Sequence, residues 1–387
     1  MENFVFQSAT KIIFGKSAER NVGKEVKKYS SKILLHYGHG SIKKYGLYER
    51  IVKSLKEEGI EIIELSGVQP NPVLSMVKKG IKICRQEKIN FILAVGGGSV
   101  IDSAKAIAIG VQLTGDIWDC IVKKVKISSA LPVGVVVTVP ASGSEASDAA
   151  VITNEEKLVK KGYHSDAIRP KFSILNPELT YSLNYYQTAC GASDIMSHVM
   201  ERYFTNTKNV DLSDRLCEAT LKTVIENTPL VLDKPDDYNG RAEIMWAATI
   251  AHNGLLGMGR IEDWGSHKLG HEIGAIYGVA HGATMSVIFP AWLKYVYKKN
   301  VGRFEQFAVR VFGIDAFSIS QESTAVRGIE ELKKFYRNIG LPVSLKDLGI
   351  GDERIDEMSE KCTAWGPVGN FVKLYEKDVK KIFKLAR

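Results

Sequence analysis

The first half of the chain alternates between short apolar segments and segments with helical periodicity, which limits the folds that it can form. Residues 33–37, 61–65, 91–95 and 133–138 are rich in Ile, Leu and Val, which predicts buried strands. The segments between them carry apolar residues at helical spacing. Alternation of strands and helices predicts a largely parallel sheet flanked by helices, as in a Rossmann-like α/β fold.

The second half of the chain has a different pattern. Residues 189–204, 211–230 and 241–256 are long stretches with a period near 3.6 and few clusters of β-branched residues, which predicts helices. A length of 387 residues also suits two domains better than one. We therefore expect an α/β domain over residues 1–183 and an all-α domain over residues 184–387.

Composition excludes several classes of protein. Hydrophobic residues make up 45% of the chain and charged residues 25%, which is ordinary for a globular protein. No apolar run approaches the roughly 20 residues that span a bilayer, and residues 1–8 do not resemble a secretory signal. The five cysteines are scattered, with no Cys-x-x-Cys pair. These features predict a cytoplasmic protein with no membrane partner.

A net charge of +8 leaves nucleic-acid binding formally open. However, the lysines are spread along the chain and alternate with glutamates, which is typical of solvated helix faces. The sequence shows no zinc-finger pattern, helix-turn-helix context or basic segment interleaved with aromatic residues. We expect no nucleic-acid partner.

Three glycine-containing loops follow predicted strands and could hold a nucleotide. Residues 96–99 read Gly-Gly-Gly-Ser and open a helix that carries Asp102 in its first turn. Glycines let the backbone approach a phosphate, whose charge a helix N-terminus stabilises. The spacing matches neither Gly-x-Gly-x-x-Gly nor a P-loop, and a bare tight turn would explain it equally well. Loops 38–41 and 138–145 strengthen the prediction, because strand ends gather at one edge of a parallel sheet.

Histidines are concentrated in one region, although the chain has only eight. His267, His271 and His281 lie within fifteen residues, and His198 follows Asp194 by four positions. Helical residues four apart share a face, so each close pair can point at one spot. Any one of these histidines could be an ordinary buried residue. Together they predict a divalent metal site with nitrogen and oxygen ligands.

A metallohydrolase is a weaker interpretation of the same histidines. That class usually carries His-Glu-x-x-His, with the glutamate acting as general base between two ligands. Here Glu272 follows His271, but position 275 is alanine.

Taken together, these segments resemble the iron-dependent (group III) alcohol dehydrogenases, in particular the butanol dehydrogenase-like branch. The likeness covers nearly the whole chain, and the shared order and spacing of its pieces make it specific. It is carried by residues 32–44, 65–72, 94–105, 169–173, 194–198 and 267–281.

The resemblance implies a metal-dependent alcohol dehydrogenase or aldehyde reductase that forms a homodimer. The expected reaction is hydride transfer between NAD(P)(H) and a short primary alcohol or aldehyde, such as butanol or butyraldehyde. A glycerol dehydrogenase, or a metal- and NAD-dependent enzyme resembling dehydroquinate synthase, is the alternative of the same architecture.

The resemblance also implies roles for individual residues. The metal ligands would be Asp194, His198, His267 and His281, with His271 nearby to relay a proton. The matching cofactor positions are Gly97, Gly98, Ser99, Asp102, Thr138, Ser142 and Lys160. The loop at 141–145 departs from the commoner family form, since Ser142 replaces a threonine and Ala141 a glycine.

Cofactor and metal preference can be argued from residue chemistry. Gly38 and Ser41 are expected to border the cofactor, and their loop carries Lys43 and Lys44 but no carboxylate. Because a carboxylate there would repel a 2′-phosphate, the loop predicts NADP(H) over NAD(H). Nitrogen and carboxylate ligands suit Fe²⁺, Zn²⁺ or Co²⁺; raw affinity favours zinc over iron, and the resemblance favours iron.

Overall fold

A computed structural model of the chain describes residues 1–123, 125–317 and 319–387. The chain forms two compact units. Gln7–Leu183 and Pro235–Asn253 make an α/β unit, whereas Met1–Phe6, Asn184–Lys234 and Gly254–Arg387 make a helical unit. The predicted fold class, a largely parallel α/β domain plus an all-α domain, is confirmed.

The α/β unit is built on a six-stranded sheet in the order β1-β8-β5-β4-β2-β3, in which all neighbouring strands are parallel. Its strands are β1 (Lys11–Phe14), β2 (Lys32–Tyr37), β3 (Glu61–Leu65), β4 (Ile92–Gly96), β5 (Val133–Val137) and β8 (Phe172–Leu175). The four strands predicted from apolar runs are β2 to β5. Strand β8 has only four residues and was not predicted.

Helices flank this sheet, and an antiparallel hairpin lies beside it. The helices are α1 (Val22–Lys27), α2 (Ser41–Lys44), α3 (Leu47–Glu57), α4 (Leu74–Gln86), α5 (Gly98–Gln112), α6 (Ile117–Val122) and α9 (Tyr238–His252). The hairpin consists of β6 (Ala149–Asn154) and β7 (Val159–His164). Short 3₁₀ turns are η1 (Ala18–Asn21), η2 (Ser144–Ala146), η3 (Asp166–Ile168) and η4 (Pro177–Thr180).

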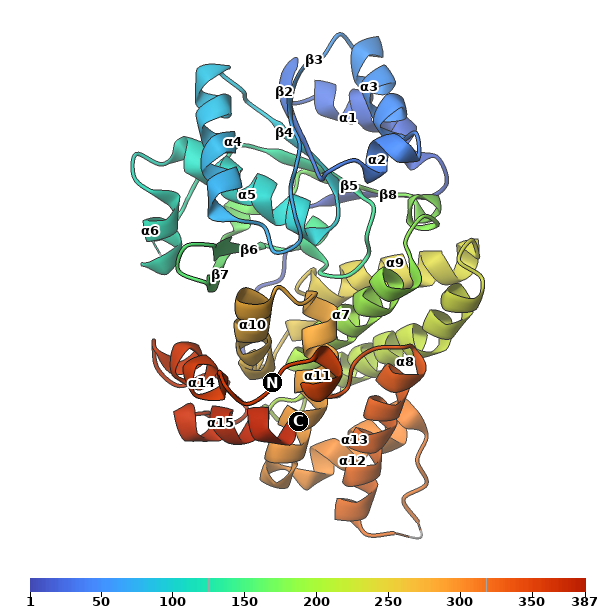
Figure 1. Cartoon of the computed structure of the whole chain (residues 1–387). Coiled ribbons are helices and arrows are strands. Elements are labelled where there is room, and N and C mark those ends of the chain that lie inside the picture. The colour runs from blue at the N-terminus through green and yellow to red at the C-terminus, as the bar shows by residue number, and fades with distance from the viewer. Residues whose placement is uncertain (124, 318) are drawn as a thin grey trace. The chain divides into compact units, whose positions relative to one another are not determined.

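Both faces of the sheet are buried. Successive strand side chains point to opposite faces, so Leu34 packs in the cluster that contains α4 and α5, whereas Ile33 and Leu35 pack with α1 and α3. Figure 1 shows α4 and α5 together on one side of the strands and α1 and α3 on the other. Burial on two faces explains why the strands are nearly continuous apolar runs.

Helix α9 belongs to the α/β unit although its sequence lies within residues 184–387, the range predicted for the helical domain. Its Thr249 hydroxyl donates to Glu145 at 2.7 Å, and the ring of Trp246 meets that of Phe14 at 6.2 Å. Helical periodicity identifies such a segment as a helix, but the partner of its apolar face is decided by tertiary packing.

The helical unit packs around aromatic side chains. Its helices are α7 (Tyr185–Tyr203), α8 (Asp211–Asp233), α10 (Gly265–Tyr277), α11 (His281–Val296), α12 (Val301–Phe312), α13 (Gln321–Asn338), α14 (Ile355–Thr363) and α15 (Glu376–Leu385), with 3₁₀ turns η5 (Leu255–Gly257), η6 (Tyr297–Lys299) and η7 (Lys346–Leu348). Buried Trp292 lies 5.9 Å from the ring of Phe204, which in turn lies 4.7 Å from Phe304. These contacts join α11, the end of α7 and α12 in one core. Across the described residues, we find no helix that combines the length and the apolarity required to cross a membrane.

Candidate active site

The three glycine-containing loops lie at neighbouring positions on one edge of the sheet. They follow β2, β4 and β5, which are adjacent and parallel, so their carboxyl ends meet at the same edge. The chain passes from β2 to β3 on one side of β2 and then returns to β4 on the other side. The carboxyl ends of β2 and β4 therefore form a topological switch point, where open α/β sheets bind ligands.

Gly98 opens α5 in a space that has no room for a side chain. A Cβ atom there would lie 2.2 Å from the Ser142 Oγ, so the loop after β5 packs directly on the first turn of the helix. Gly97 precedes α5 as its N-cap, and Ser99 lies in its first turn. Thr138 continues β5, and its N–H donates to the Gly96 carbonyl at 3.1 Å. The predicted residues of these two loops are thus brought together.

The Asp102 carboxylate is held by the neighbouring loop and hairpin. It accepts hydrogen bonds from the Ser144 hydroxyl at 2.6 Å and from the Val151 N–H at 3.0 Å. Burial raises the pKa of Asp102, and the nearby Lys105 ammonium opposes that rise. Lys160, another predicted cofactor residue, lies on β7 and donates to the Asn71 side chain at 2.9 Å.

In the helical unit, three helices supply the predicted metal ligands. Asp194 and His198 lie one turn apart on α7, His267 lies in the first turn of α10, and His281 is the first residue of α11. The Asp194 Oδ1 lies 3.5 Å from the His281 Nε2 and 3.6 Å from the His198 Nδ1.

A close contact between α7 and α11 positions His281. A Cβ on Gly282 would lie 2.0 Å from the Cys190 carbonyl oxygen, so only glycine lets the two backbones approach this closely. The Ser193 hydroxyl donates to the Gly282 carbonyl at 2.7 Å. Together, these contacts place the start of α11 beside the α7 turn that carries Asp194.

The geometry of these donors suits a divalent ion. One ligand atom each from Asp194, His267 and His281 lies within 4.8 Å of the others, and all three side chains are buried or half-buried. Ligands that share one ion at about 2 Å lie within about 4 Å of one another, so small side-chain movements would complete such a site. The His198 ring lies 4.8 Å from that of His267, and the His271 ring lies 5.5 Å from that of His281. All five predicted residues therefore lie in one cluster.

Two models of one protein family match the chain. "Iron-containing alcohol dehydrogenase" matches residues 9–177, and "Fe-containing alcohol dehydrogenase family, C-terminal" matches residues 188–387. The chain belongs to the iron-containing alcohol dehydrogenase family. The resemblance stated from the sequence is thereby confirmed.

Relatives of the chain match it over nearly their whole length. The probable NADH-dependent butanol dehydrogenase 2 of Bacillus subtilis (strain 168) is 45% identical and covers 99% of each chain. The NADPH-dependent aldehyde reductase YqhD of Escherichia coli (strain K12) is 36% identical, over 95% of this chain and 94% of its own. The crystal structure of NADH-dependent butanol dehydrogenase A from Thermotoga maritima superposes with a TM-score of 0.96, at 43% identity, covering 100% of this chain and 99% of its own. The family carries out alcohol and aldehyde oxidoreduction with NAD(P)(H), and its name assigns it iron.

Two buried charged residues near the candidate sites were not predicted from the sequence. Lys105 lies one turn after Asp102, and its ammonium donates to the carbonyl oxygens of Ser144, Ser147 and Ala149 at 2.6 to 2.9 Å. Burial lowers the pKa of Lys105 to about 8. Glu201 follows His198 by three positions on α7, and burial raises the pKa of its carboxyl to about 7. Its helical spacing from His198 was the one signal in the sequence that could have identified it.

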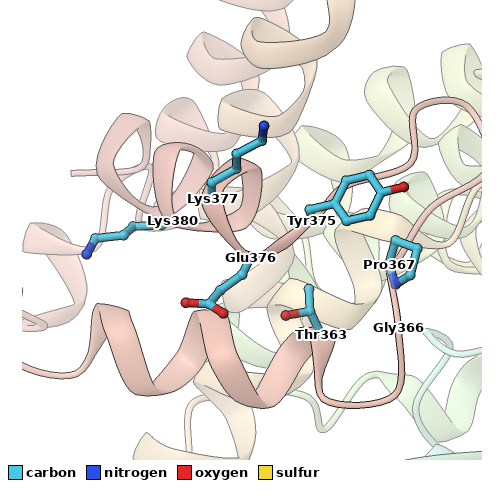
Figure 2. Close-up of a pocket in the computed structure, with 7 residues that line it drawn as sticks. All are labelled: Thr363, Gly366, Pro367, Tyr375, Glu376, Lys377 and Lys380. Carbon is cyan, nitrogen blue, oxygen red and sulfur yellow. The ribbon is translucent and has the colours of Figure 1, made fainter.

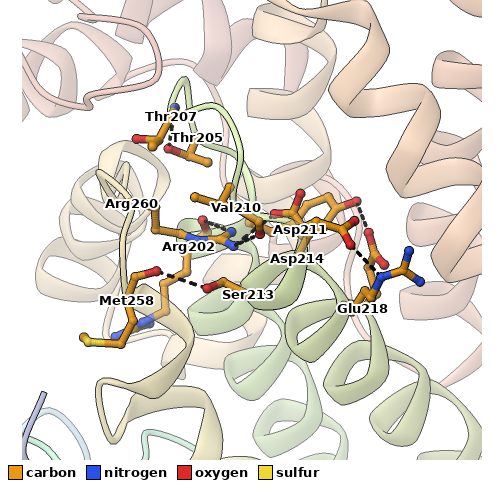
Figure 3. A network of polar contacts seen from close by, with 12 residues as sticks. Arg202, Thr205, Thr207, Val210, Asp211, Ser213, Asp214, Glu218, Met258 and Arg260 are labelled. Carbon is orange, nitrogen blue, oxygen red and sulfur yellow. Dashed lines mark hydrogen bonds and ion pairs between the residues drawn. The ribbon is translucent and has the colours of Figure 1, made fainter. Parts of the chain in front are cut away.

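Two arginines hold the C-terminal end of α7 in place (Figure 3). Arg202 donates to the His198 carbonyl at 2.7 Å, and Arg260 donates to the Arg202 carbonyl at 3.0 Å. Arg260 also forms an ion pair with Asp214 of α8 at 3.0 Å. This network holds the helix that carries Asp194 and His198 against its neighbours.

Two clefts in the protein are lined by residues other than the predicted metal and cofactor residues. One, of about 540 Å³ (Figure 2), is lined by Thr363, Gly366, Pro367, Tyr375, Glu376, Lys377 and Lys380. The other, of about 650 Å³, is lined by residues 125–128 and 162–167. As far as the chain is described, neither lining includes a predicted metal or cofactor residue.

Proposed function

We propose that this protein interconverts short primary alcohols and aldehydes, such as butanol and butyraldehyde, in a metal-dependent reaction with NADP(H). The observation that carries the proposal is the convergence of Asp194, His267 and His281 donor atoms within 4.8 Å in a member of this family. The names of its relatives, butanol dehydrogenases and an aldehyde reductase, support the same substrate class.

Asp194, His198, His267 and His281 are the proposed metal ligands, and Fe²⁺ is the proposed ion. Three neutral imidazoles and one carboxylate leave a dication with a formal charge of +1. When bound, such an ion acts as a Lewis acid toward the substrate oxygen on which negative charge develops. The chain's own contribution is to hold the four donors on three packed helices.

His271 is the proposed proton relay. It is one turn from His267 on α10, and its ring lies 5.5 Å from that of His281. A protonated imidazole at this place can give its proton to the alkoxide oxygen formed when the aldehyde is reduced, and the neutral imidazole can then take up a proton from water. His271→Gln should lower kcat and flatten the pH profile of kcat while leaving metal content unchanged.

Gly38, Ser41, Gly97, Gly98, Ser99, Asp102, Thr138, Ser142 and Lys160 are the proposed cofactor contacts. The proposed preference for NADP(H) rests on the loop after β2. On the neighbouring strand β3, the Glu64 carboxylate accepts hydrogen bonds from the hydroxyls of Tyr37 and Tyr48, each at 2.6 Å. Four of the relatives are named NADH-dependent and one NAD-dependent, whereas one is named NADPH-dependent and one NADP-dependent, so the kinetic comparison decides between the cofactors.

The test measures butyraldehyde-dependent oxidation of NADPH and NADH by the purified protein, together with its metal content. We expect activity that chelation abolishes and Fe²⁺ restores, with kcat/KM about tenfold higher for NADPH, equivalent to about 1.4 kcal/mol. Ser41→Asp, which adds the missing carboxylate, should lower kcat/KM for NADPH more than for NADH. Equal turnover after complete chelation would refute the metal role, and higher kcat/KM with NADH would refute the cofactor preference.

We further propose that the protein works as a homodimer in the cytoplasm. Its five cysteines are buried thiols, which suits a reducing compartment. Light scattering of the purified protein tests the dimer, and a monomer at micromolar concentration would contradict it.

A further inference from the structure

One buried carboxylate meets both the backbone and the side chain of a proposed metal ligand. Glu201 of α7 is fully buried. Its Oε1 accepts hydrogen bonds from the His267 Nδ1 at 2.7 Å, the His267 N–H at 3.0 Å and the Ser266 hydroxyl at 2.5 Å. Its Oε2 accepts from the Trp264 N–H at 2.6 Å. The side chain therefore bridges α7 and the first turn of α10.

The contact with Nδ1 determines which ring nitrogen of His267 carries the proton. An ionised Glu201 carboxylate accepts but does not donate, so in that state Nδ1 is the protonated nitrogen. The lone pair of His267 is then on Nε2, and a lone pair is what a metal ligand must offer. The opposite tautomer would set the Nδ1 lone pair against a negative oxygen 2.7 Å away.

Glu201 also stabilises the helix end that presents the ring. The first N–H groups of a helix have no partner within the helix, and negative charge there is favourable. Trp264, the N-cap of α10, has a φ of 66°, in the left-handed region that non-glycine residues rarely adopt. Its N–H bond to Glu201 and its indole bond to Glu262 at 2.6 Å hold this conformation.

We propose that Glu201 is a positioning residue that sets the tautomer and orientation of His267 for metal binding. The inference rests on the proposed metal site. All four groups that meet Glu201 donate to it, so a glutamine would turn an N–H toward at least one donor. Carboxylates that orient a ligating histidine typically contribute 10- to 100-fold in metal affinity, as an order of magnitude.

The test compares Glu201→Gln with Ser266→Ala in the full-length protein. Ser266→Ala removes one donor to the same Oε1 atom but leaves the bond to the His267 Nδ1 intact. After removal of bound metal, Co²⁺ affinity is measured from the visible absorption of the metal in competition with a chelator. We expect Glu201→Gln to weaken Co²⁺ binding about 10- to 100-fold, and Ser266→Ala to weaken it less than about threefold.

A second measurement reports the tautomer directly and does not depend on a variant that folds. Nitrogen NMR of ¹⁵N-histidine-labelled, metal-free wild-type protein above neutral pH distinguishes the two tautomers, and His267→Gln assigns the signal. We expect proton occupancy on Nδ1 of His267. A proton on Nε2, or equal Co²⁺ affinity in wild type and Glu201→Gln, would overturn the inference. Wild-type protein that binds no Co²⁺ would overturn the proposed metal site, and this inference with it.

Discussion

Acidification should destabilise the α/β unit through a single buried histidine. The His36 Nδ1 lies 2.9 Å from the Leu65 carbonyl oxygen, and its Nε2 lies 2.9 Å from the Ser103 Oγ. Because a carbonyl can only accept, Nδ1 carries the proton and Nε2 accepts from the serine hydroxyl. The side chain has no exposed surface, and burial lowers the pKa of His36 to about 4.

The magnitude follows from the difference between folded and unfolded pKa values. An unfolded histidine titrates near 6.5, so between pH 4 and 6.5 the unfolded chain binds more protons than the folded one. The stability contributed by neutral His36 is therefore present above pH 6.5 and is lost as the pH falls through 4. A difference of about 2.5 units (6.5 − 4), at about 1.36 kcal/mol per unit, amounts to about 3 kcal/mol.

Urea denaturation of wild type, His36→Gln and His39→Gln at a series of pH values tests this prediction. Glutamine does not titrate, so the free energy of unfolding of wild type should fall by about 3 kcal/mol more than that of His36→Gln between about pH 7.5 and 4. His39 is exposed, and its variant should follow wild type. If His36→Gln shows the same pH dependence as wild type, the reasoning about its tautomer and burial is wrong.

Three further substitutions test contacts that position the two sites. Lys105→Met leaves three buried carbonyl groups without their charged donor and should cost about 3 kcal/mol in urea denaturation, whereas Lys82→Met, at an exposed position of α4, should cost less than about 0.5 kcal/mol. Gly98→Ala forces a methyl group against a serine hydroxyl and should weaken NADPH binding about tenfold in a fluorescence titration; unchanged affinity would place the cofactor elsewhere. Gly282→Ala pushes α11 away from the α7 backbone and should cost about 1–3 kcal/mol, with weaker Co²⁺ binding; a variant as stable as wild type would show that this contact relaxes freely.

The sequence predicted the parts of the fold that depend on local pattern. Strands β2 to β5 are buried on both faces, so each appears as a continuous apolar run that needs no knowledge of its neighbours. Strand β8 is only four residues long, and its place between β1 and β5 is a matter of tertiary pairing. The packing of α9 on the α/β unit was unpredictable for the same reason, since periodicity shows an apolar face but not what covers it.

In the candidate site, too, features that depend on local spacing were predictable and features that depend on tertiary packing were not. The spacing of four between Asp194 and His198 predicted that both would face one point, and the structure places their side chains 3.6 Å apart. The approach of His281 to Asp194 depends instead on the contact between Gly282 and Cys190, nearly a hundred residues away in sequence. The burial of Glu201 and Lys105 was not predicted, because their hydrogen-bond partners are also distant in sequence. A single charged residue on a helix normally faces solvent.

The assignment of α9 to the α/β unit has a consequence for biosynthesis. Residues 7–183 emerge from the ribosome first, but Glu145 cannot meet Thr249 until α9 has been made. The 69 residues from Leu183 to His252 (252 − 183) take about 3–14 seconds to add at about 5–20 residues per second. During that interval the nascent chain carries an α/β unit that still lacks α9.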